Sequence, residues 1–234
     1  MTSLFLVTSA IYTSYGKFST EERIEQTKET IKSIETYAPD SKIVLLDAGD
    51  KSVYIDFGVE LINYNQNSII IEPLNNYLKN SRDLEPDIII KSMLEIIMFK
   101  DYLKSHSLQN YSRIFKLSGR YKLNSKFNYS KHLEAKNKVL ILPPYTTQHL
   151  YNFNVASSMF LYMTRCWSFD SSLADDITKT YSKMKEDIIK ISQTKKQGDI
   201  EHLLYKHLNK KLVNHIDVMG VEGYWAPRGK WIQE

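Results

Sequence analysis

Apolar and polar positions along the chain follow two periods, and each period predicts a type of element. The continuous apolar run from Leu4 to Thr8 is typical of a strand that is covered on both faces. Ser19 and Glu22 form a capping box that starts a helix, and Pro39 ends that helix. Its apolar stripe consists of Ile24, Thr27, Ile31 and Ile34. A second apolar run, Ile43 to Leu46, completes a right-handed βαβ unit with parallel strands.

The same patterns continue over the rest of the chain. They predict strands at 59–64, 113–117, 138–145 and 158–163, a long apolar helix that starts near Pro86, and a short helix in "GDIEHLLYKHL". A further helix has apolar positions at steps of three and four, namely Leu173, Ile177, Tyr181, Met184, Ile188 and Ile191. We therefore expect an α/β fold with a mostly parallel central sheet flanked by helices, in a single domain over residues 1–234.

Composition and charge narrow the class of protein. The chain has 234 residues, of which 42% are hydrophobic and 25% are charged, as in a globular domain. Cys166 is the one cysteine, no signal peptide is evident and no apolar run could span a membrane, so a cytoplasmic location is expected. The net charge of +4 comes mainly from residues 179–196. Those lysines are either the hydrated face of the helix or a surface that attracts an anionic substrate or membrane.

Two common nucleotide-binding motifs are absent. Neither GxGxxG nor GxxxxGK[ST] occurs, so a Rossmann dinucleotide site and a P-loop are not expected.

Polar residues at the end of one predicted strand and near the start of one predicted helix each have a structural and a functional interpretation. Asp47 and Asp50 in "DAGD" either form a turn or place Asp47 on a nucleotide base or ribose. Lys91 near a helix start either pairs with Glu95 one turn later or binds a phosphate.

The segment "FKLSGRY" is the most specific signal in the chain. Lys116 and Ser118 lie on one face of the predicted strand. Gly119 permits close approach of a ligand to the backbone, or an unusual dihedral angle. Arg120 presents a planar fork of donors that suits a diphosphate. The alternative is a strand end with a surface arginine.

Taken together, five segments resemble small GT-A-type glycosyltransferases of the kind found in bacterial and phage surface-polysaccharide gene sets. These segments are "FLVTS", "KIVLLDAGD", "KSMLE", "FKLSGRYKL" and "GVEGYWAPRGKW". The resemblance implies a hexosyltransferase-like enzyme that binds a nucleotide-sugar, UDP-sugar by family habit, on residues 1–125. Residues 126–234 would then supply the acceptor side and a C-terminal closure.

The resemblance also assigns roles to the polar residues. Thr8, Ser9 and Asp47 would line the base and ribose side, and Ser118 to Tyr121 would form the floor. Most members of this fold hold a divalent metal (Mn²⁺ or Mg²⁺) with a DxD motif, but no DxD occurs in this chain, which argues against metal dependence. Lys116 and Arg120 are the cations expected to neutralise the diphosphate in its place.

A carboxylate is the usual base that activates an acceptor hydroxyl. Glu201 is the first candidate and Asp199 the second, although Asp199 also suits a helix N-cap and Glu201 also complements the helix dipole. His215 is either structural or a late metal ligand. Trp225 and Arg228 lie in the final segment, which either closes over the donor or anchors the terminus to the core through its tryptophans.

Two alternatives to a glycosyltransferase stay open. One is a nucleotidyltransferase-like enzyme, which would need a metal and a carboxylate pair beside the phosphates. The other is a non-catalytic nucleotide- or carbohydrate-binding protein of the same fold. The expected partners are a nucleotide-sugar and an acceptor glycan, without nucleic acid; contact with a membrane surface and the oligomeric state are left open.

Overall fold

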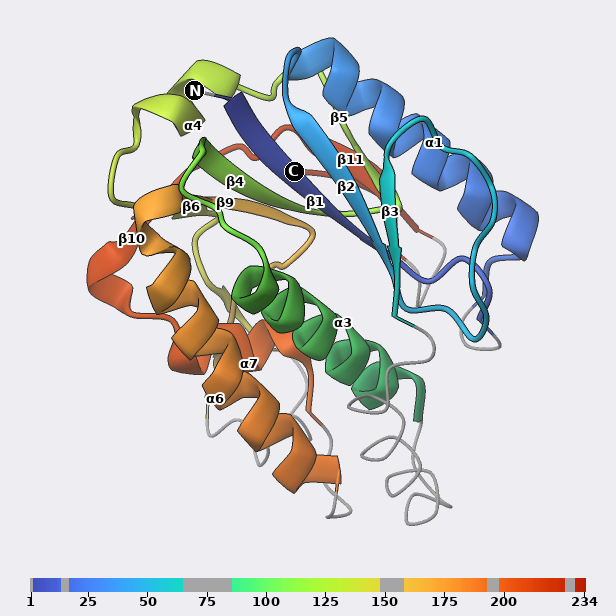
Figure 1. Ribbon diagram of the computed structural model, residues 1–234. Coiled ribbons are helices and arrows are strands. Elements are labelled where there is room, and N and C mark those ends of the chain that lie inside the picture. Colours follow the sequence, from blue (N-terminus) through green and yellow to red (C-terminus); the bar gives the residue numbers. More distant parts are fainter. Residues whose placement is uncertain (1, 14–16, 65–85, 148–157, 193–197, 226–229) are drawn as a thin grey trace.

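A central sheet of seven strands organises the computed structural model, which describes residues 2–13, 17–64, 86–147, 158–192, 198–225 and 230–234 (Figure 1). The strand order is β10-β6-β9-β4-β1-β2-β3. The strands are β1 (Thr2–Ser9), β2 (Lys42–Asp47), β3 (Glu60–Asn63), β4 (Tyr111–Ser118), β6 (Val139–Ile141), β9 (Cys166–Asp170) and β10 (Val213–His215). Only β9 runs antiparallel to its neighbours in this sheet. The predicted α/β class with a mostly parallel sheet is confirmed.

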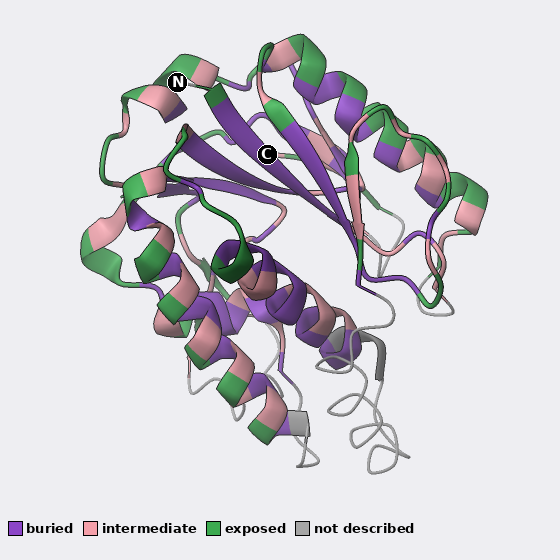
Figure 2. Ribbon diagram, in the orientation of Figure 1, coloured by how far each residue is buried: buried purple, intermediate pink, exposed green. Residues whose placement is uncertain are grey.

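Helices cover both faces of this sheet. On one face lies α1 (Thr20–Tyr37), and on the other lie α3 (Pro86–Ser105), α6 (Ala174–Ser192) and α7 (Ile200–His207). Alternate residues of β1 enter the two cores, Leu4 and Leu6 on the α3 side and Phe5 and Val7 on the α1 side. All four are completely buried, which explains the continuous apolar run (Figure 2). In the described part of the chain, no helix combines the length and apolar character that a membrane span requires.

The capping box of α1 is present, but the buried face of this helix is more polar than its sequence indicates. Ser19 Oγ accepts from the amide of Glu22, and the Glu22 carboxylate accepts from the amide of Ser19. Ile24, which we assigned to the apolar stripe, is only half-buried. The residues that are buried are Arg23, Thr27, Thr30, Ile31, Ser33 and Ile34. The helix therefore turns a partly polar surface toward the sheet.

The strand β9 was not predicted, although it lies in the middle of the sheet between β4 and β6. A buried arginine holds this region together. Arg113 on β4 donates to Ser168 Oγ at 2.9 Å and to the carbonyls of Ser168, Ala135 and Lys138. His132 lies against the same hydroxyl at 2.7 Å, and burial lowers the pKa of His132 to about 3. These hydrogen bonds tie β4 and β9 to the short helix α4 (Tyr129–Glu134).

Two predicted strands of the second half are wrong in extent. The run 138–145 splits into β6 and β7 (Tyr145–Thr146), because Pro143 and Pro144 supply no amide donors. The run 158–163 contains only β8 (Phe160–Leu161), which pairs with β7 as a hairpin outside the central sheet. Short 3₁₀ turns occur at Ser171–Leu173 and Lys210–Leu212.

A second sheet of three antiparallel strands lies beside α1. Its order is β12-β11-β5, with β5 (Tyr121–Leu123), β11 (Val221–Trp225) and β12 (Lys230–Gln233). The strand β5 begins at Tyr121, directly after Arg120. In the antiparallel pairing of β5 with β11, Tyr121 lies opposite Gly223. The end of the chain is thereby placed next to the Ser-Gly-Arg segment.

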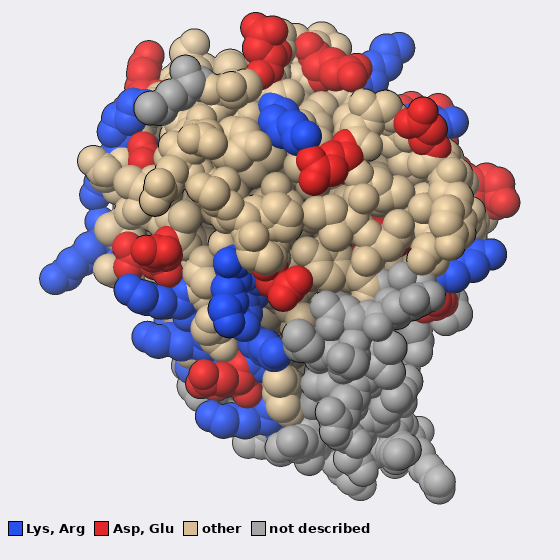
Figure 3. Space-filling view, in the orientation of Figure 1, with Lys and Arg blue, Asp and Glu red and all other residues tan. Residues whose placement is uncertain are grey.

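The surface over α3 and α6 carries a group of lysines (Figure 3). The six predicted apolar positions are all buried, five of them on α6 and Leu173 in the 3₁₀ turn before it, so the predicted stripe is confirmed. Lys185 on α6 lies close to Lys100 and Lys104 of α3, and burial together with these two cations lowers the pKa of Lys185. The structure thus shows a local excess of positive charge on this face.

Candidate functional site

A pocket lies at the edge of the sheet where the parallel strands β1, β2 and β4 end. It has about 720 Å³ of space that opens to solvent. Its lining comes from the ends of these strands and the loops after them, from α1 and from α3. The lining residues are Thr8, Ser9, Ala10, Ile11, Thr13, Ala48, Ser118, Gly119 and Arg120 at the strand ends and loops, Arg23 and Thr27 on α1, and Ile90, Lys91, Leu94, Glu95 and Met98 on α3. Ligands of open α/β sheets bind at this edge, at the carboxyl ends of the strands.

Asp47 holds the loops behind the pocket in place. Its carboxylate is completely buried and accepts from Ser9 Oγ at 2.7 Å, from the Ile11 amide at 2.8 Å and from the Gly49 amide at 2.9 Å. A side chain at Gly49 would lie 2.6 Å from the carbonyl oxygen of Tyr12, so glycine is required at this close approach. Of the two roles considered for Asp47, these contacts favour the turn, because its oxygens already have three donors.

Two arginines, Arg23 and Arg120, line the pocket close enough for their charges to interact. Arg23 is 8% exposed and donates to the carbonyls of Phe18 and Ala10. Burial and the nearby guanidinium of Arg120 lower the pKa of Arg23. The Arg120 guanidinium has no ion pair and no hydrogen bond to any described residue, and its side chain contacts the Tyr121 ring. Two like charges held together in a pocket form a site for an anion.

Sequence reasoning did not select Arg23, although a signal was available. The residue lies in the first turn of α1, where a cation opposes the helix dipole and an acidic residue is favoured. Its neighbours Glu21 and Glu22 follow that rule. A buried cation at a helix N-terminus is therefore an exception that indicates a binding role, since an anion beside it would also contact the helix end.

Hydroxyl and backbone groups complete the pocket. Thr8 Oγ1 is buried and has no hydrogen-bond partner in the described structure, so it is available to a ligand. Gly119 has no left-handed dihedral angle, which excludes that explanation for the glycine. Instead its amide donates to the Thr8 carbonyl at 2.8 Å, and an added Cβ would lie 3.3 Å from that oxygen. The glycine thus allows the Ser-Gly-Arg segment to lie directly against β1.

Lys116 lies behind the pocket lining and its charge is already paired. The side chain is 1% exposed, and its ammonium lies 2.7 Å from Glu95 Oε1 and 2.6 Å from the Thr164 carbonyl oxygen. Glu95 is the one acidic residue among the described lining residues. The ion pair thus joins β4 to α3 on the α3 face of the sheet. Glu95 also lies one turn along α3 from Lys91. Lys116 supports the pocket wall and does not line it.

Replacing Lys116 with methionine should destabilise the protein. The change leaves the Glu95 carboxylate without its partner, and breaking a buried ion pair costs roughly 3–5 kcal/mol. We expect a value near the low end, about 3 kcal/mol, because the Glu95 side chain is 21% exposed. Urea unfolding followed by circular dichroism measures this free energy.

Two control variants show whether the lower free energy of unfolding of K116M comes from the broken ion pair. The double variant K116M/E95Q removes both charges and should recover most of the stability. The variant K42M breaks the pair between Lys42 and Glu60, whose side chains are 45% and 43% exposed, and should cost less than about 1 kcal/mol. Equal losses in K116M and the double variant would show that packing, and not the charge pair, is lost.

Glu201 and Asp199 lie at the start of α7, beside this ion pair. Asp199 is the N-cap of α7, and its carboxylate accepts from the His202 amide and contacts His202 Nδ1 at 2.7 Å. Glu201 accepts from Thr164 Oγ1 at 3.2 Å. Burial and the carboxylates of Asp199 and Glu95 raise the pKa of Glu201 to about 7. Neither residue is among those that line the pocket, whereas Glu95, whose charge raises the pKa of Glu201, is.

Some of the remaining predicted site residues line the pocket and others do not. Tyr121 is 2% exposed, and its ring lies between the guanidiniums of Arg120 and Arg165, outside the lining. Trp225 ends β11 and is half-buried, and Arg228 lies outside the described residues. His215 is exposed and lies 3.5 Å from the Tyr162 hydroxyl. Lys91, Ser118, Gly119 and Arg120 all line the pocket.

The arrangement of elements resembles three solved enzymes. LgtC, a galactosyltransferase in complex with donor and acceptor sugar analogues, aligns with a TM-score of 0.53 at 9% identity over 91% of this chain and 72% of its own. Core-mannan synthase A from Aspergillus fumigatus, in an Mn/GDP form, has a TM-score of 0.57 at 10% identity over 95% and 74%. The mannosyltransferase Ktr4p from S. cerevisiae has a TM-score of 0.60 at 10% identity over 92% and 68%. The chain has the GT-A glycosyltransferase fold.

Sequence comparison adds nothing to this assignment of the GT-A fold. No protein-family model matches the chain, and no curated protein matches its sequence.

The described donor set at the Ser-Gly-Arg position does not fit the metal site that the GT-A fold implies. Ser118, Gly119 and Arg120 supply a hydroxyl, no side chain and a cation, whereas Mn²⁺ and Mg²⁺ prefer carboxylate oxygens. In the described parts of the chain, no group of three or more His, Cys, Asp or Glu side chains is arranged so that it could hold a metal ion. Asp47 and Glu95 are engaged by the hydrogen bonds and the ion pair described above.

Proposed function

We propose that this protein is a glycosyltransferase that moves a sugar from a nucleotide-sugar donor to a hydroxyl acceptor. The observation that carries the proposal is the pair of Arg23 and Arg120 at the carboxyl ends of β1 and β4. The fold supports it, because the three solved enzymes that share the fold carry the names of glycosyltransferases or a mannan synthase. The pair suits a diphosphate, whose negative charge grows as the bond to the sugar breaks.

The donor would lie across the ends of the parallel strands. Arg23 and Arg120 would hold the diphosphate, and Lys91 near the start of α3 would add a third positive charge. Thr8 Oγ1 and Ser118 would offer hydroxyl contacts to the ribose or phosphate oxygens. Arg23 thereby takes the role that the sequence suggested for Lys116, whose charge is bound to Glu95. Fixed cations neutralise the leaving group in this scheme, so no step is assigned to a metal.

The acceptor hydroxyl would lose its proton to a carboxylate in this scheme. Glu201 is our first candidate, because a pKa near 7 suits a general base at neutral pH. Asp199 is the second candidate, and it raises the pKa of Glu201 in either case. A UDP-sugar donor with a hexose, a role in surface-polysaccharide synthesis and a cytoplasmic location complete the proposal, as the sequence resemblance implies.

Binding and turnover of a donor panel test the proposal. UDP-, GDP- and CMP-sugars are incubated with the protein, with Mn²⁺ or with EDTA, and released nucleotide is measured together with the thermal unfolding midpoint. We expect one nucleotide class to stabilise the protein, by about 2.7 kcal/mol at a hundredfold excess over its dissociation constant. Turnover should persist in EDTA. The proposal fails if no nucleoside diphosphate stabilises the protein.

Adding acceptors to this panel, and in a parallel assay a nucleoside triphosphate with a sugar phosphate, separates the two alternatives. A nucleotidyltransferase would release pyrophosphate from a nucleoside triphosphate and a sugar phosphate, and it would lose this activity in EDTA. A non-catalytic binding protein would be stabilised by the nucleotide and would release no product with any acceptor. Transfer in EDTA, with nucleoside diphosphate as product, distinguishes the glycosyltransferase from both.

A further inference from the structure

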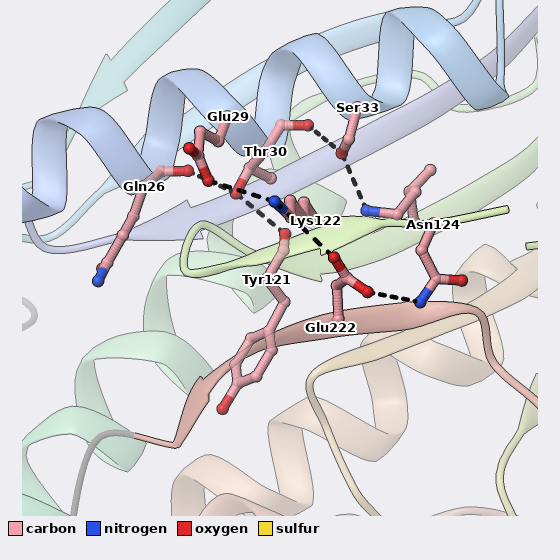
Figure 4. Close-up of polar contacts among 9 residues, drawn as sticks. Gln26, Glu29, Thr30, Ser33, Tyr121, Lys122, Asn124 and Glu222 are labelled. Atoms are coloured by element: carbon pink, nitrogen blue, oxygen red, sulfur yellow. Dashed lines mark hydrogen bonds and ion pairs between the residues drawn. The ribbon is translucent and has the colours of Figure 1, made fainter. Parts of the chain in front are cut away.

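A second groove lies between α1 and the three-stranded sheet, next to the pocket (Figure 4). It has about 300 Å³ of space, which opens to solvent. Its lining consists of Gln26, Glu29, Thr30, Arg120, Lys122, Glu222, Gly223, Tyr224 and Trp231. Arg120 lines both spaces, so the groove and the pocket meet at this side chain.

The groove has exposed aromatic rings on its sheet side. Tyr224 and Trp231 are each 44% exposed, and their rings meet edge to face at 4.9 Å and 79°. The ring of Phe18 lies 6.4 Å from that of Tyr224. Because Trp231 is so exposed, it does not anchor the chain end in a core. The Lys122 ammonium lies over the Trp231 ring, 5.7 Å from its centroid, and the exposed parts of the Tyr224 and Trp231 rings suit the C–H faces of a sugar ring.

Polar groups from both α1 and the three-stranded sheet also line the groove. Lys122 lies between Glu29, at 3.7 Å, and Glu222, at 3.8 Å, so its charge is shared by two carboxylates (Figure 4). Gln26 Oε1 is buried and has no hydrogen-bond partner in the described structure. A native protein rarely leaves such an acceptor unsatisfied, so a ligand donor is expected there. Carboxylates and an amide oxygen accept from hydroxyl groups, and they disfavour an anion.

The shape of the groove depends on one glycine. A Cβ added at Gly223 would lie 2.4 Å from the Arg120 carbonyl oxygen and 2.7 Å from the Tyr121 ring. The absence of a side chain therefore lets β11 approach β5 closely, directly beside Arg120. The aromatic wall is fixed next to the place where the proposed diphosphate would be held.

We propose that this groove is the subsite for a sugar ring of the acceptor glycan. The inference rests on the proposed function, which supplies the donor on the other side of Arg120. Exposed aromatic rings, the unsatisfied Gln26 oxygen and two carboxylates match the C–H faces and hydroxyl groups of a neutral polyol. A nucleobase fits less well, because the two rings meet edge to face and leave no parallel pair to enclose it.

The assignment is tested by measuring how the parent protein and variants at groove residues bind to an array of immobilised oligosaccharides. Binding of UDP, GDP and CMP is measured in parallel by calorimetry. We expect the parent protein to bind a subset of the glycans. W231A and Y224A should each weaken that binding by roughly fivefold to tenfold, the loss of one stacking partner. Q26L should also weaken it while the thermal midpoint stays level or rises, because a buried unsatisfied oxygen is removed. Y54A is the matched control, since Tyr54 is 91% exposed and far along the chain from the groove.

The outcomes separate this inference from the proposed function. Unchanged glycan binding in W231A, Y224A and Q26L would overturn the inference, and so would weaker nucleotide binding in W231A and Y224A, which would make the groove part of the donor site. Donor turnover without any glycan binding would overturn it as well. Glycan binding that depends on Trp231, in a protein that binds no nucleotide, would uphold the groove and refute the proposed function.

Discussion

The variant R120A is expected to bind a nucleoside diphosphate about 10- to 150-fold more weakly than the parent protein. This range corresponds to about 1.5–3 kcal/mol, the value of hydrogen bonds to a charged group. Arg120 has no ion pair or hydrogen bond to a described residue, and it contributes to the lining of both the pocket and the groove. Calorimetry with UDP, GDP and CDP measures the effect.

The stability of R120A distinguishes a binding role from a structural one. Arg120 lowers the pKa of Arg23, so the two guanidiniums repel each other in the free protein. Removing one of them should leave the thermal midpoint unchanged or raise it, as is common when a residue is kept for function. A lower midpoint with normal affinity would refute the assignment. K126A is the charge control, since Lys126 is an exposed cation a few residues beyond Arg120.

R120K tests the geometry of the same contact. Lysine keeps the charge but lacks the planar fork that bonds two oxygens at once. We therefore expect its affinity to lie between those of R120A and the parent protein. If Arg23 and Arg120 act on a common phosphate, R120A should also bind with a weaker dependence on salt concentration, because fewer charges contribute.

Much of the pocket follows from the sequence because it depends on parallel strands. The apolar runs of β1, β2 and β4 are long enough to recognise, and their carboxyl ends must meet at one edge of the sheet. This logic alone brings Thr8, Ser118 and Arg120 together, and all three line the pocket. The capping box of α1 is equally local, so its prediction was confirmed.

The features that the sequence did not predict depend on contacts between distant segments of the chain. The five residues of β9 show no alternation, because all are buried, and only the packing around Arg113 explains their place in the sheet. Arg23 was missed, since its burial depends on Phe18 and Ala10, which lie outside the helix. The partner of Lys116 is on α3. A pattern within one element cannot reveal such pairings.

The charges around the pocket form two separate groups. Arg23, Lys91 and Arg120 line the open space, whereas Lys116 and Glu95 neutralise each other at its wall. The first group favours an anion in the pocket. The second places the Glu95 carboxylate at the pocket wall, close enough to Glu201 to raise the pKa of Glu201. A donor with a diphosphate and an acceptor that must lose a proton need both groups.

Replacing Glu201 with glutamine is expected to lower the rate of sugar transfer by about 10²- to 10⁴-fold, the usual contribution of a general base. Donor affinity should stay within twofold of the parent, because Arg23 and Arg120 are unchanged. Glutamine keeps the oxygen that accepts from Thr164 Oγ1, so the start of α7 should be preserved. Steady-state kinetics with the donor and acceptor found in the panels gives both values.

The pH dependence of transfer provides a second test of Glu201. A base must be ionised to act, so the rate of the parent protein should rise with pH and reach half its maximum near 7. The free energy of unfolding should instead fall as the pH rises. The folded pKa of about 7 exceeds the ordinary value of 4.5, so the stabilising effect of the bound proton is lost as the pH rises through about 7. E201Q should lack this loss.

The variant D199N decides between the two carboxylates. Asp199 raises the pKa of Glu201, so if Glu201 is the base, D199N should retain transfer and shift the half-maximal rate to lower pH. If Asp199 is the base, D199N should lose transfer and E201Q should keep it. Asparagine is also a good N-cap, so α7 should remain folded in the variant. Full transfer in both variants would leave Glu95, the acidic residue of the pocket lining, as the carboxylate to replace next.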